Sequence, residues 1–372
     1  MLTEITINKQ ALLHNVSQFR KVAGSAKLMV VVKSNAYGHG YFAVASCIED
    51  KVDYFGVASL SEALSLREIK IKKPILVLNY YELTQVESAV LKNISLVVYD
   101  LSQVKTIQAA AKKLKKKALV HIKVGTGLSR LGVFAKDSLS FTKQVLKMPN
   151  IIVEGIFSHF AASEDDPGFT MIQLEHFRKI ISELESNNIE IPIKHIACTA
   201  SALAFPETHF GMIRIGIGIY GLQSYKSIYS KVLKTYEGFS LKKALTWKTK
   251  ILAVKDLPVG AYVGYGRTYQ TTRKTKLAIL PVGYHEGYDR GLSNNSEVLI
   301  NGVRCPVRGR IYMNLMSVDV TKVKNAKAGD TAVLIGTQGR EEITADELAV
   351  KAGTINYEIV TRINPIIPRL II

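Results

Sequence analysis

The sequence predicts an α/β protein with an N-terminal (β/α)8 barrel and a C-terminal, mainly β domain. Up to about residue 235, eight apolar runs rich in β-branched residues alternate with helical stretches, a pattern typical of parallel strands with crossover helices. After about residue 236, strand-like runs continue, but Gly, Pro and Asn turns join them and few helices intervene. We therefore expect a barrel over 7–235 and a second domain over 236–372, and residues 1–6 are candidates for pairing with that second domain.

Eight β/α repeats in this length match the size of a closed barrel. The apolar runs span 27–34, 54–59, 74–79, 94–100, 118–125, 151–159, 192–199 and 211–216. Ser59 and Glu62 predict a capping box for the helix that follows the second run, and Ser61 is an alternative cap. In the second domain we expect one helix, with a capping box formed by Thr344 and Glu347.

Composition and cysteine spacing indicate a protein of the cytoplasm. The chain has 372 residues, of which 47% are hydrophobic, so it has enough apolar material for a large core. Its three cysteines lie far apart, without metal-type spacing, which favours a reducing compartment and no metal site. The start lacks a secretory pattern, and no apolar run approaches the roughly 18 residues needed to cross a bilayer.

The net charge of +18 raises the question of a polyanionic partner. Its densest cluster, residues 112–117, ends a helical stretch that begins near Leu101, where cations suit the negative end of a helix. No aromatic residues interleave with these lysines as stacking platforms. We therefore expect a solvated, lysine-rich surface and neither a nucleic-acid nor a membrane partner.

Lys33 stands where the first apolar run ends, in VVVKSNAYGHG. A lysine at the C-terminal end of a barrel strand lies at the face where such folds keep their active sites, and burial there favours the neutral amine that forms a Schiff base. A solvated strand end or an ion pair is the alternative interpretation. The ends of the other strands decide between them.

Polar residues gather at the predicted ends of several other strands, the same face of the barrel. These are Lys123 near the end of run five and Arg130 beyond it, Ser158 and His159 at the end of run six, Cys198 and Thr199 at the end of run seven, and Arg214 in run eight. Phosphate sites of barrels often lie after strands seven and eight, where Thr199 offers a hydroxyl and Gly216 and Ile217 offer backbone N–H groups. A phosphorylated aldehyde would suit both this site and Lys33.

Two motifs leave alternatives open. The stretch from Gly216 to Gly221 matches G-x-G-x-x-G, but seven β/α repeats precede it, whereas a dinucleotide fingerprint normally occupies the first βα turn. In YVGYGRTY, glycines flank Tyr265 and would expose its phenol to another surface, with an ordinary β-turn as the alternative.

The chain resembles the alanine racemases across nearly its whole length. The motifs that carry the resemblance occur in the order VVVKSNAYGHG, HIKVGTGLSRLG, SHF, RIGIGIYG, VGYGRTY, LPVGYHEGYDRG, GRIYMN and INYE. The resemblance implies a homodimer that binds pyridoxal 5′-phosphate, shares its active sites between subunits and interconverts L- and D-alanine, the latter used for bacterial peptidoglycan.

The resemblance also implies two opposed bases, because a planar carbanion must lose its proton on one face and regain one on the other. Lys33 corresponds to the lysine that binds the cofactor and serves the D-enantiomer, and Tyr265 of the other subunit serves the L-enantiomer. A free phenol, with a pKa of about 10, is protonated at pH 7, so it needs a neighbouring group. The family pattern places His159 beside it, with Arg214 behind.

Further roles follow from the same resemblance. Arg214 would donate to the pyridine nitrogen and leave it unprotonated, which weakens the cofactor as an electron sink and limits side reactions. Arg130 and the backbone N–H of Met313 would bind the substrate carboxylate, and Tyr284 would line the entrance. The cofactor phosphate would be held by Tyr37, Thr199, Gly216, Ile217 and Tyr357.

The chain departs from the family pattern at a few positions near the cleft. It has Gly125 where relatives commonly have aspartate, Cys198 where they have asparagine, and Tyr312 and Asn314 in place of cysteine and aspartate. Lys123 matches a lysine that is carbamylated in many members, and an unmodified lysine is the alternative. We expect a racemase of alanine; a racemase of serine or another small amino acid is the alternative, followed by a decarboxylase or a non-enzymatic polyanion-binding protein.

Overall fold

The computed structural model describes residues 2–223 and 229–372. The chain divides into two compact units, a barrel unit made of residues 11–34 and 44–242 and a β unit made of 1–10, 35–43 and 243–372. Met1, part of the segment expected to pair with the second domain, lies outside the described residues.

The barrel unit is built on eight parallel strands in the order β10-β2-β3-β4-β5-β6-β8-β9. Between β9 and β10, the N–H of Gly211 donates to the carbonyl of Lys194 at 3.0 Å, and that of Arg214 to the carbonyl of Ala197 at 3.3 Å. The predicted fold class is therefore confirmed. The strands are β2 (Lys27–Val31), β3 (Tyr54–Ser59), β4 (Ile75–Tyr80), β5 (Ser95–Val98), β6 (Ala118–Gly125), β8 (Ile151–Phe157), β9 (Ile193–His195) and β10 (Met212–Ile215).

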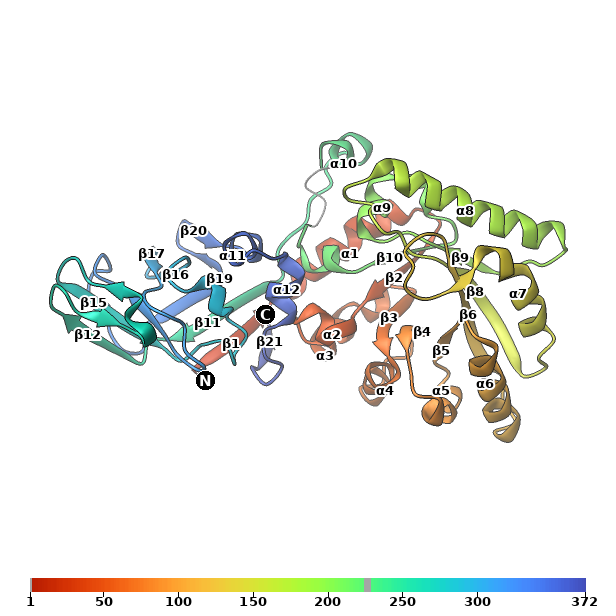
Figure 1. Ribbon diagram of the computed structural model, residues 1–372, viewed down its shortest axis with the longest axis horizontal. Helices are drawn as coiled ribbons and strands as arrows, with labels where there is room; N and C mark the ends of the chain where they lie inside the picture. Colours follow the sequence, from red (N-terminus) through yellow and green to blue (C-terminus); the bar gives the residue numbers. More distant parts are fainter. Residues whose placement is uncertain (1, 224–228) are drawn as a thin grey trace. The chain divides into compact units, whose positions relative to one another are not determined.

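Helices follow the strands as the crossover pattern requires, and Figure 1 shows α4 to α8 outside the strands. The helices are α1 (Lys9–Ala23), α2 (Lys33–Tyr37), α3 (Tyr41–Ile48), α4 (Leu60–Glu68), α5 (Val86–Leu91), α6 (Leu101–Lys113), α7 (Ser138–Leu146), α8 (Pro167–Ser186), α9 (Thr199–Ala204) and α10 (Tyr229–Thr235). Inside the barrel, apolar side chains from five strands pack together: Met29, Tyr54, Leu76, Ile193 and Met212. The interior is thus a packed core at this level.

Both predicted N-caps are present. However, the carboxylates of Glu62 and Glu347 do not accept from the backbone N–H of the cap residue, as a capping box requires. The Ser59 side chain accepts from the N–H of Glu62 at 3.4 Å, and Thr344 accepts from that of Glu347 at 3.0 Å. The Glu62 carboxylate accepts from the N–H groups of Ala58 and Ser34, in place of that of Ser59. The Glu347 carboxylate binds Arg304 and Lys351.

The β unit consists mainly of strands. Its largest sheet has the order β17-β16-β19-β11-β1-β21, with β20 on β19, and two smaller sheets join β12, β15 and β18 and pair β13 with β14. The strands are β1 (Thr3–Ile7), β11 (Leu245–Lys250), β12 (Ala253–Leu257), β13 (Tyr262–Val263), β14 (Tyr269–Gln270), β15 (Thr275–Leu280), β16 (Glu297–Ile300), β17 (Val303–Pro306), β18 (Met316–Asp319), β19 (Thr331–Gln338), β20 (Glu341–Ile343) and β21 (Arg369–Ile371). Trp247 of β11 is 1% exposed and packs edge-on against Tyr288.

The expectation of a single helix in this unit is wrong. Besides α11 (Ala345–Ala352) there is α12 (Asn356–Thr361). Two short helices result because Gly353, with φ of +70°, ends α11 in the left-handed conformation that only glycine adopts at little cost. The N–H of Arg362 closes α12 on the carbonyl of Glu358.

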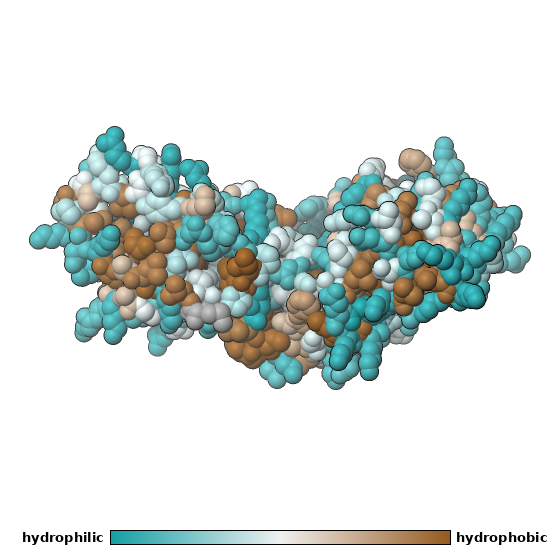
Figure 2. Space-filling model, turned by 90° about the horizontal axis from the view of Figure 1, so that it is seen from below, coloured by the Kyte–Doolittle hydropathy of each residue, from teal (hydrophilic) through white to brown (hydrophobic). Residues whose placement is uncertain are grey.

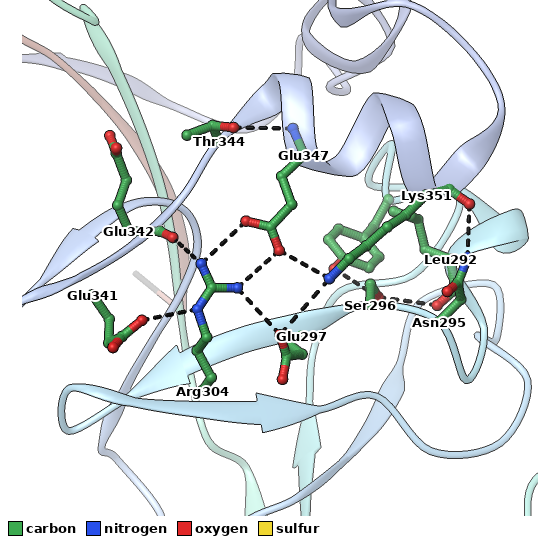
Figure 3. A network of polar contacts seen from close by, with 11 residues as sticks. Leu292, Asn295, Ser296, Glu297, Arg304, Glu341, Glu342, Thr344, Glu347 and Lys351 are labelled. Carbon is green, nitrogen blue, oxygen red and sulfur yellow. Dashed lines mark hydrogen bonds and ion pairs between the residues drawn. The ribbon is translucent and has the colours of Figure 1, made fainter.

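An ion-pair network joins α11 to strands of the β unit (Figure 3). Arg304 of β17 lies 2.8 Å from a carboxylate oxygen of Glu347, 2.9 Å from one of Glu341 and 3.2 Å from one of Glu297. Lys351 binds Glu347 at 2.9 Å, one helical turn away. The helix is thereby tied to β16, β17 and β20.

Hydrophilic residues cover much of the face in Figure 2, and apolar residues form separate patches among them. Among the described residues, no helix has the length and apolar composition of a membrane span.

Candidate functional site

Lys33 lies two residues after the last residue of β2, at the start of an unusual turn. Residues 34 to 37 all have positive φ, between 52° and 55°, so α2 is a single left-handed turn formed without glycine. Each such residue costs roughly 1–2 kcal/mol, which the surrounding structure must offset. Strain of this kind is concentrated at functional sites. The predicted strand over 27–34 is therefore too long, because the chain leaves the sheet after Val31.

Hydrogen bonds at both ends offset part of this strain. The backbone N–H of Ser34 donates to the Glu62 carboxylate at 2.6 Å, and the N–H of Tyr41 donates to the Asn35 side chain at 3.2 Å. The N–H of Gly40 donates to the carbonyl of Asn35 at 2.8 Å. The glutamate predicted as half of a capping box thus anchors the segment that carries Lys33.

The Lys33 amine is partly buried and faces other cations. Burial is the largest cause that lowers its pKa, Arg130 lowers it further, and Glu62 opposes the shift. For Lys123, 3% exposed on β6, burial followed by Arg130, Arg214 and Lys33 lowers the pKa to about 8. The two amines and two guanidinium groups therefore form one electropositive cluster, which raises the share of neutral amine at neutral pH.

A hollow of about 280 Å³ lies beside this cluster. Lys123, Arg130, Ser158 and His159 line it, together with the loop over 124–134. Gly132 allows the loop to return against β6, since a Cβ there would lie 2.8 Å from the N of Gly125. The site is therefore concave, positively charged and partly built from backbone.

Arg214 is 4% exposed and has several acceptors. Nη1 donates to Nδ1 of His195 at 2.8 Å, and Nη2 lies 3.1 Å from Nδ1 of His159, 2.8 Å from the Ser158 carbonyl and 2.9 Å from the Ile196 carbonyl. Burial lowers the pKa of Arg214 to about 10, so it remains a cation at neutral pH. Burial, followed by the charge of Arg214, holds the pKa of His159 well below its usual range, so this imidazole is neutral.

The segment with the G-x-G-x-x-G pattern forms no dinucleotide loop. Residues Ile217–Tyr220 form a short 3-10 turn directly after β10, the eighth barrel strand. The N–H of Gly216 donates to the Thr199 hydroxyl at 3.2 Å, so these two predicted phosphate ligands are neighbours. A Cβ on Gly218 would lie 2.6 Å from Phe19, which explains the second glycine of the pattern by close packing.

The remaining predicted site residues belong to the β unit. Tyr265 is 72% exposed, lies between Gly264 and Gly266, which have φ of 78° and 70°, and packs edge-on against Tyr312. Tyr265, Tyr284 and Met313 line one hollow of about 670 Å³. In another part of this unit the rings of Tyr37 and Tyr357 lie 6.0 Å apart.

Comparison with known proteins identifies the family. The family model described as "Alanine racemase, N-terminal domain" matches residues 7–224, and that described as "Alanine racemase, C-terminal domain" matches 244–371. The chain belongs to the alanine racemase family.

Individual relatives match this chain over nearly their whole length. Alanine racemase 1 of Caldanaerobacter subterraneus subsp. tengcongensis is 40% identical over 99% of this chain and 94% of its own, and the alanine racemase of Methanococcus maripaludis is 40% identical over 98% and 97%. The solved alanine racemase of Clostridium difficile 630 superposes with a TM-score of 0.93 at 32% identity, covering 100% of this chain and 96% of its own.

Alanine racemases are pyridoxal-phosphate-dependent isomerases, and the residues of this chain fit that cofactor chemically. The cofactor requires an amine, a hydrogen-bond donor for its ring nitrogen and donors for its phosphate. Lys33 offers the amine, and the hydroxyl of Thr199 offers a phosphate donor. Within the described chain, Nε of Arg214 makes no hydrogen bond, so this guanidinium keeps a free donor.

Reasoning from the sequence missed three residues that extend from Arg214 into the barrel. His195 contacts Arg214, His121 contacts His195, and Glu154 lies beside His121. His121 and His195 are 0% exposed, and Glu154 faces His121. One signal was available: His121 stands two residues before Lys123, so both side chains lie on the same side of β6 and point into the barrel.

Proposed function

We propose that this protein is an alanine racemase that binds pyridoxal 5′-phosphate beside Lys33 and interconverts L- and D-alanine. The observation that carries the proposal is the partly buried amine of Lys33 in a cluster with Lys123, Arg130 and Arg214, in a chain of the alanine racemase family. When bound, the cofactor supplies an aldehyde for amines and a ring system that accepts the electrons released at the substrate's α-carbon.

Lys33 would act first as a nucleophile and then as a base. Because burial and Arg130 lower its pKa, more of the amine is neutral at pH 7 than in a solvated lysine. The left-handed turn after Lys33 fixes the backbone from which the side chain extends. Lys33 would thus remove or return the α-proton on one face of the substrate.

His159 is suited to assist a phenolate on the opposite face. Its Nδ1 accepts from Arg214 at 3.1 Å, so its single proton lies on Nε2. A neutral imidazole protonated on Nε2 can donate a hydrogen bond to a phenolate oxygen, and it adds no positive charge to that of Arg214. We propose that Tyr265 of a second subunit accepts this bond and acts as the second base.

Other residues would bind and position the ligands. We propose that Thr199, Gly216, Ile217, Tyr37 and Tyr357 hold the phosphate, that Arg214 donates to the ring nitrogen, that Arg130 and the N–H of Met313 bind the carboxylate, and that Tyr284 lines the entrance. Lys123 is the proposed carbamylation site, because a neutral amine is the form that reacts with carbon dioxide and burial lowers the pKa of Lys123 to about 8. The carbamate would place an anion beside Arg130.

The proposed setting is a cytoplasmic homodimer that supplies D-alanine for peptidoglycan and binds neither nucleic acid nor membrane. Loss of the family's aspartate at Gly125 is compatible with this function, since a Cβ there would make ordinary contact, 3.6 Å from the Val133 carbonyl. Gly125 is therefore not a position where only glycine fits. None of the comparisons favours serine as the substrate.

The test is D-alanine formation from L-alanine by the wild type and by Lys33→Ala and Tyr265→Phe variants. We expect losses of at least about a thousandfold for both, because each removes one of two bases. Tyr262→Phe is the matched control, as Tyr262 is an exposed tyrosine of the same segment, and it should retain activity. Full activity of Lys33→Ala, or equal rates with serine and alanine in the wild type, would contradict the proposal.

A further inference from the structure

The hydrogen bonds of Arg214 define the proton positions on a buried pair of histidines. A guanidinium has only donors, so Nδ1 of His195, 2.8 Å from Nη1 of Arg214, must be an acceptor. Burial, then the charge of Arg214, keeps the pKa of His195 well below its usual range, so the ring carries one proton. That proton therefore lies on Nε2.

The same reasoning extends to the second histidine. Nε2 of His195 lies 3.0 Å from Nδ1 of His121, so His195 donates and His121 accepts. Burial is the largest cause lowering the pKa of His121, which is neutral as well. Its proton is left on Nε2, an atom with no hydrogen-bond partner among the described residues.

The carboxylate of Glu154 lies beside His121, on the side away from His195. Oε2 of Glu154 is 3.7 Å from Nε2 of His121 and accepts from the Ser95 hydroxyl at 2.5 Å. Glu154 occupies a β-bulge: Val120 pairs with Val153 and His121 pairs with Gly155, so Glu154 is an extra residue on β8. Bulges re-aim side chains, and here the carboxylate is brought to the unpaired Nε2–H.

The packing around the histidines leaves them little freedom. A Cβ on Gly155 would lie 2.3 Å from Nδ1 of His121, so only glycine fits beside that ring. On the other side, Phe157 stacks on His195 with centroids 4.8 Å apart and planes 10° apart. The Arg214 guanidinium lies 5.5 Å from the centre of the same Phe157 ring.

We propose that Glu154, His121 and His195 form a relay of positioning residues for Arg214. Its two hydrogen bonds run from the guanidinium through His195 to His121, and the Glu154 carboxylate faces the last N–H at 3.7 Å as an ionic contact. The relay places one negative charge at the far end of a line of polarisable rings and so compensates the buried cation. It also holds Nη1 in place, which fixes the direction of the free Nε–H of Arg214.

The first test measures where the protons lie. In the purified full-length protein labelled with ¹⁵N-histidine, NMR should show His121 and His195 as neutral rings protonated on Nε2, with His121→Gln and His195→Gln used to assign the signals. A proton on Nδ1 of either ring, or a doubly protonated ring, would overturn the proposal. This readout stands whether or not the proposed function is correct.

The second test changes the charge at the end of the relay. Glu154→Gln should lower kcat for alanine about tenfold, because the relay loses its negative charge, with KM within twofold because Arg130 is untouched. It should also change the His121 ¹⁵N shifts. Glu185→Gln is the control, since it removes a carboxylate that pairs with Lys194 of β9 outside the relay.

The outcomes separate the two proposals. The kcat effect rests on the proposed function, so a wild type without racemase activity would overturn that function and leave the relay to be decided by NMR. If Glu154→Gln and Glu185→Gln have the same kcat in an active enzyme, Glu154 does not position Arg214. If Glu154→Gln does not fold, the wild-type proton positions alone decide.

Discussion

Lys123 is a buried cation among other cations, which makes its protonation costly. Its pKa falls from the ordinary 10.5 to about 8, with burial as the largest cause. Between pH 8 and 10.5 the unfolded chain therefore binds more protons at this residue than the folded chain does. By linkage, this lysine makes the free energy of unfolding rise with pH across that window, and its full cost is present below pH 8.

We predict that Lys123→Met removes part of this slope. In buffer freed of carbon dioxide, the unfolding free energy of the wild type should rise more steeply between pH 8 and 10.5 than that of the variant, and the variant should be the more stable at pH 7. Urea unfolding at several pH values measures both. Lys143→Met, which removes an exposed lysine of α7, is the control; an equal loss of slope there would show that burial is not the cause.

Helix α11 depends on charge as well as on apolar packing. Three carboxylates surround Arg304 and raise its pKa, with Glu347 as the largest cause. Burial alone would raise the pKa of Glu347, but hydrogen bonds from Arg304 and Lys351 lower it overall. The stability from this pairing is therefore present above the ordinary carboxyl pKa and is lost as the pH falls through the lowered value.

We predict that Arg304→Met lowers the free energy of unfolding by about 1–2 kcal/mol at pH 7, because three carboxylates lose their shared partner in a setting that is only partly buried. Thermal unfolding at pH 7 and pH 4 measures the effect, which should be smaller at pH 4. Lys243→Met breaks the exposed pair with Glu342 and should change stability by less than about 0.5 kcal/mol. Equal effects of the two variants would show that the network is not cooperative.

The elements that follow from local sequence were predictable. Eight runs of β-branched and aliphatic residues mark the barrel strands, and the caps at Ser59 and Thr344 follow from side chains that accept nearby N–H groups. The left-handed turn at 34–37 was not predictable, because none of its residues is glycine. The contact between His121 and His195 joins residues 74 apart in sequence, so no local pattern reports it. The proposed roles of Lys33 and Tyr265 as opposed bases rest on the family resemblance, whereas the place of Lys33 at a strand end by itself made it only a candidate for Schiff-base chemistry.

At the scale of the whole molecule, the proposed enzyme would need two chains for each site. Lys33 belongs to the barrel unit, and Tyr265 is 72% exposed on the β unit beside Met313, which is 56% exposed. The side chains of Tyr265 and Met313 line the same hollow. Exposed apolar and aromatic side chains that gather at one place on a surface are typical of an interface with another subunit. This exposure is compatible with the proposed homodimer, in which Tyr265 of one subunit would reach Lys33 of the other.

We predict that two inactive variants complement each other. When Lys33→Ala and Tyr265→Phe chains are coexpressed, about half of the dimers are mixed, and each mixed dimer has one complete site, so activity should recover to about a quarter of the wild type. Each variant expressed alone is the control. If mixed dimers isolated with two affinity tags stay inactive, the sites are not shared.

The position of Trp247 gives the molecule a built-in optical probe. It is the only tryptophan in the sequence, and it lies buried on β11 of the β unit. Its fluorescence therefore reports the loss of that unit's core alone, whereas circular dichroism reports helices that belong mostly to the barrel unit. Melting curves recorded by both signals would coincide if the two units unfold as one cooperative block, and would separate if each melts at its own temperature.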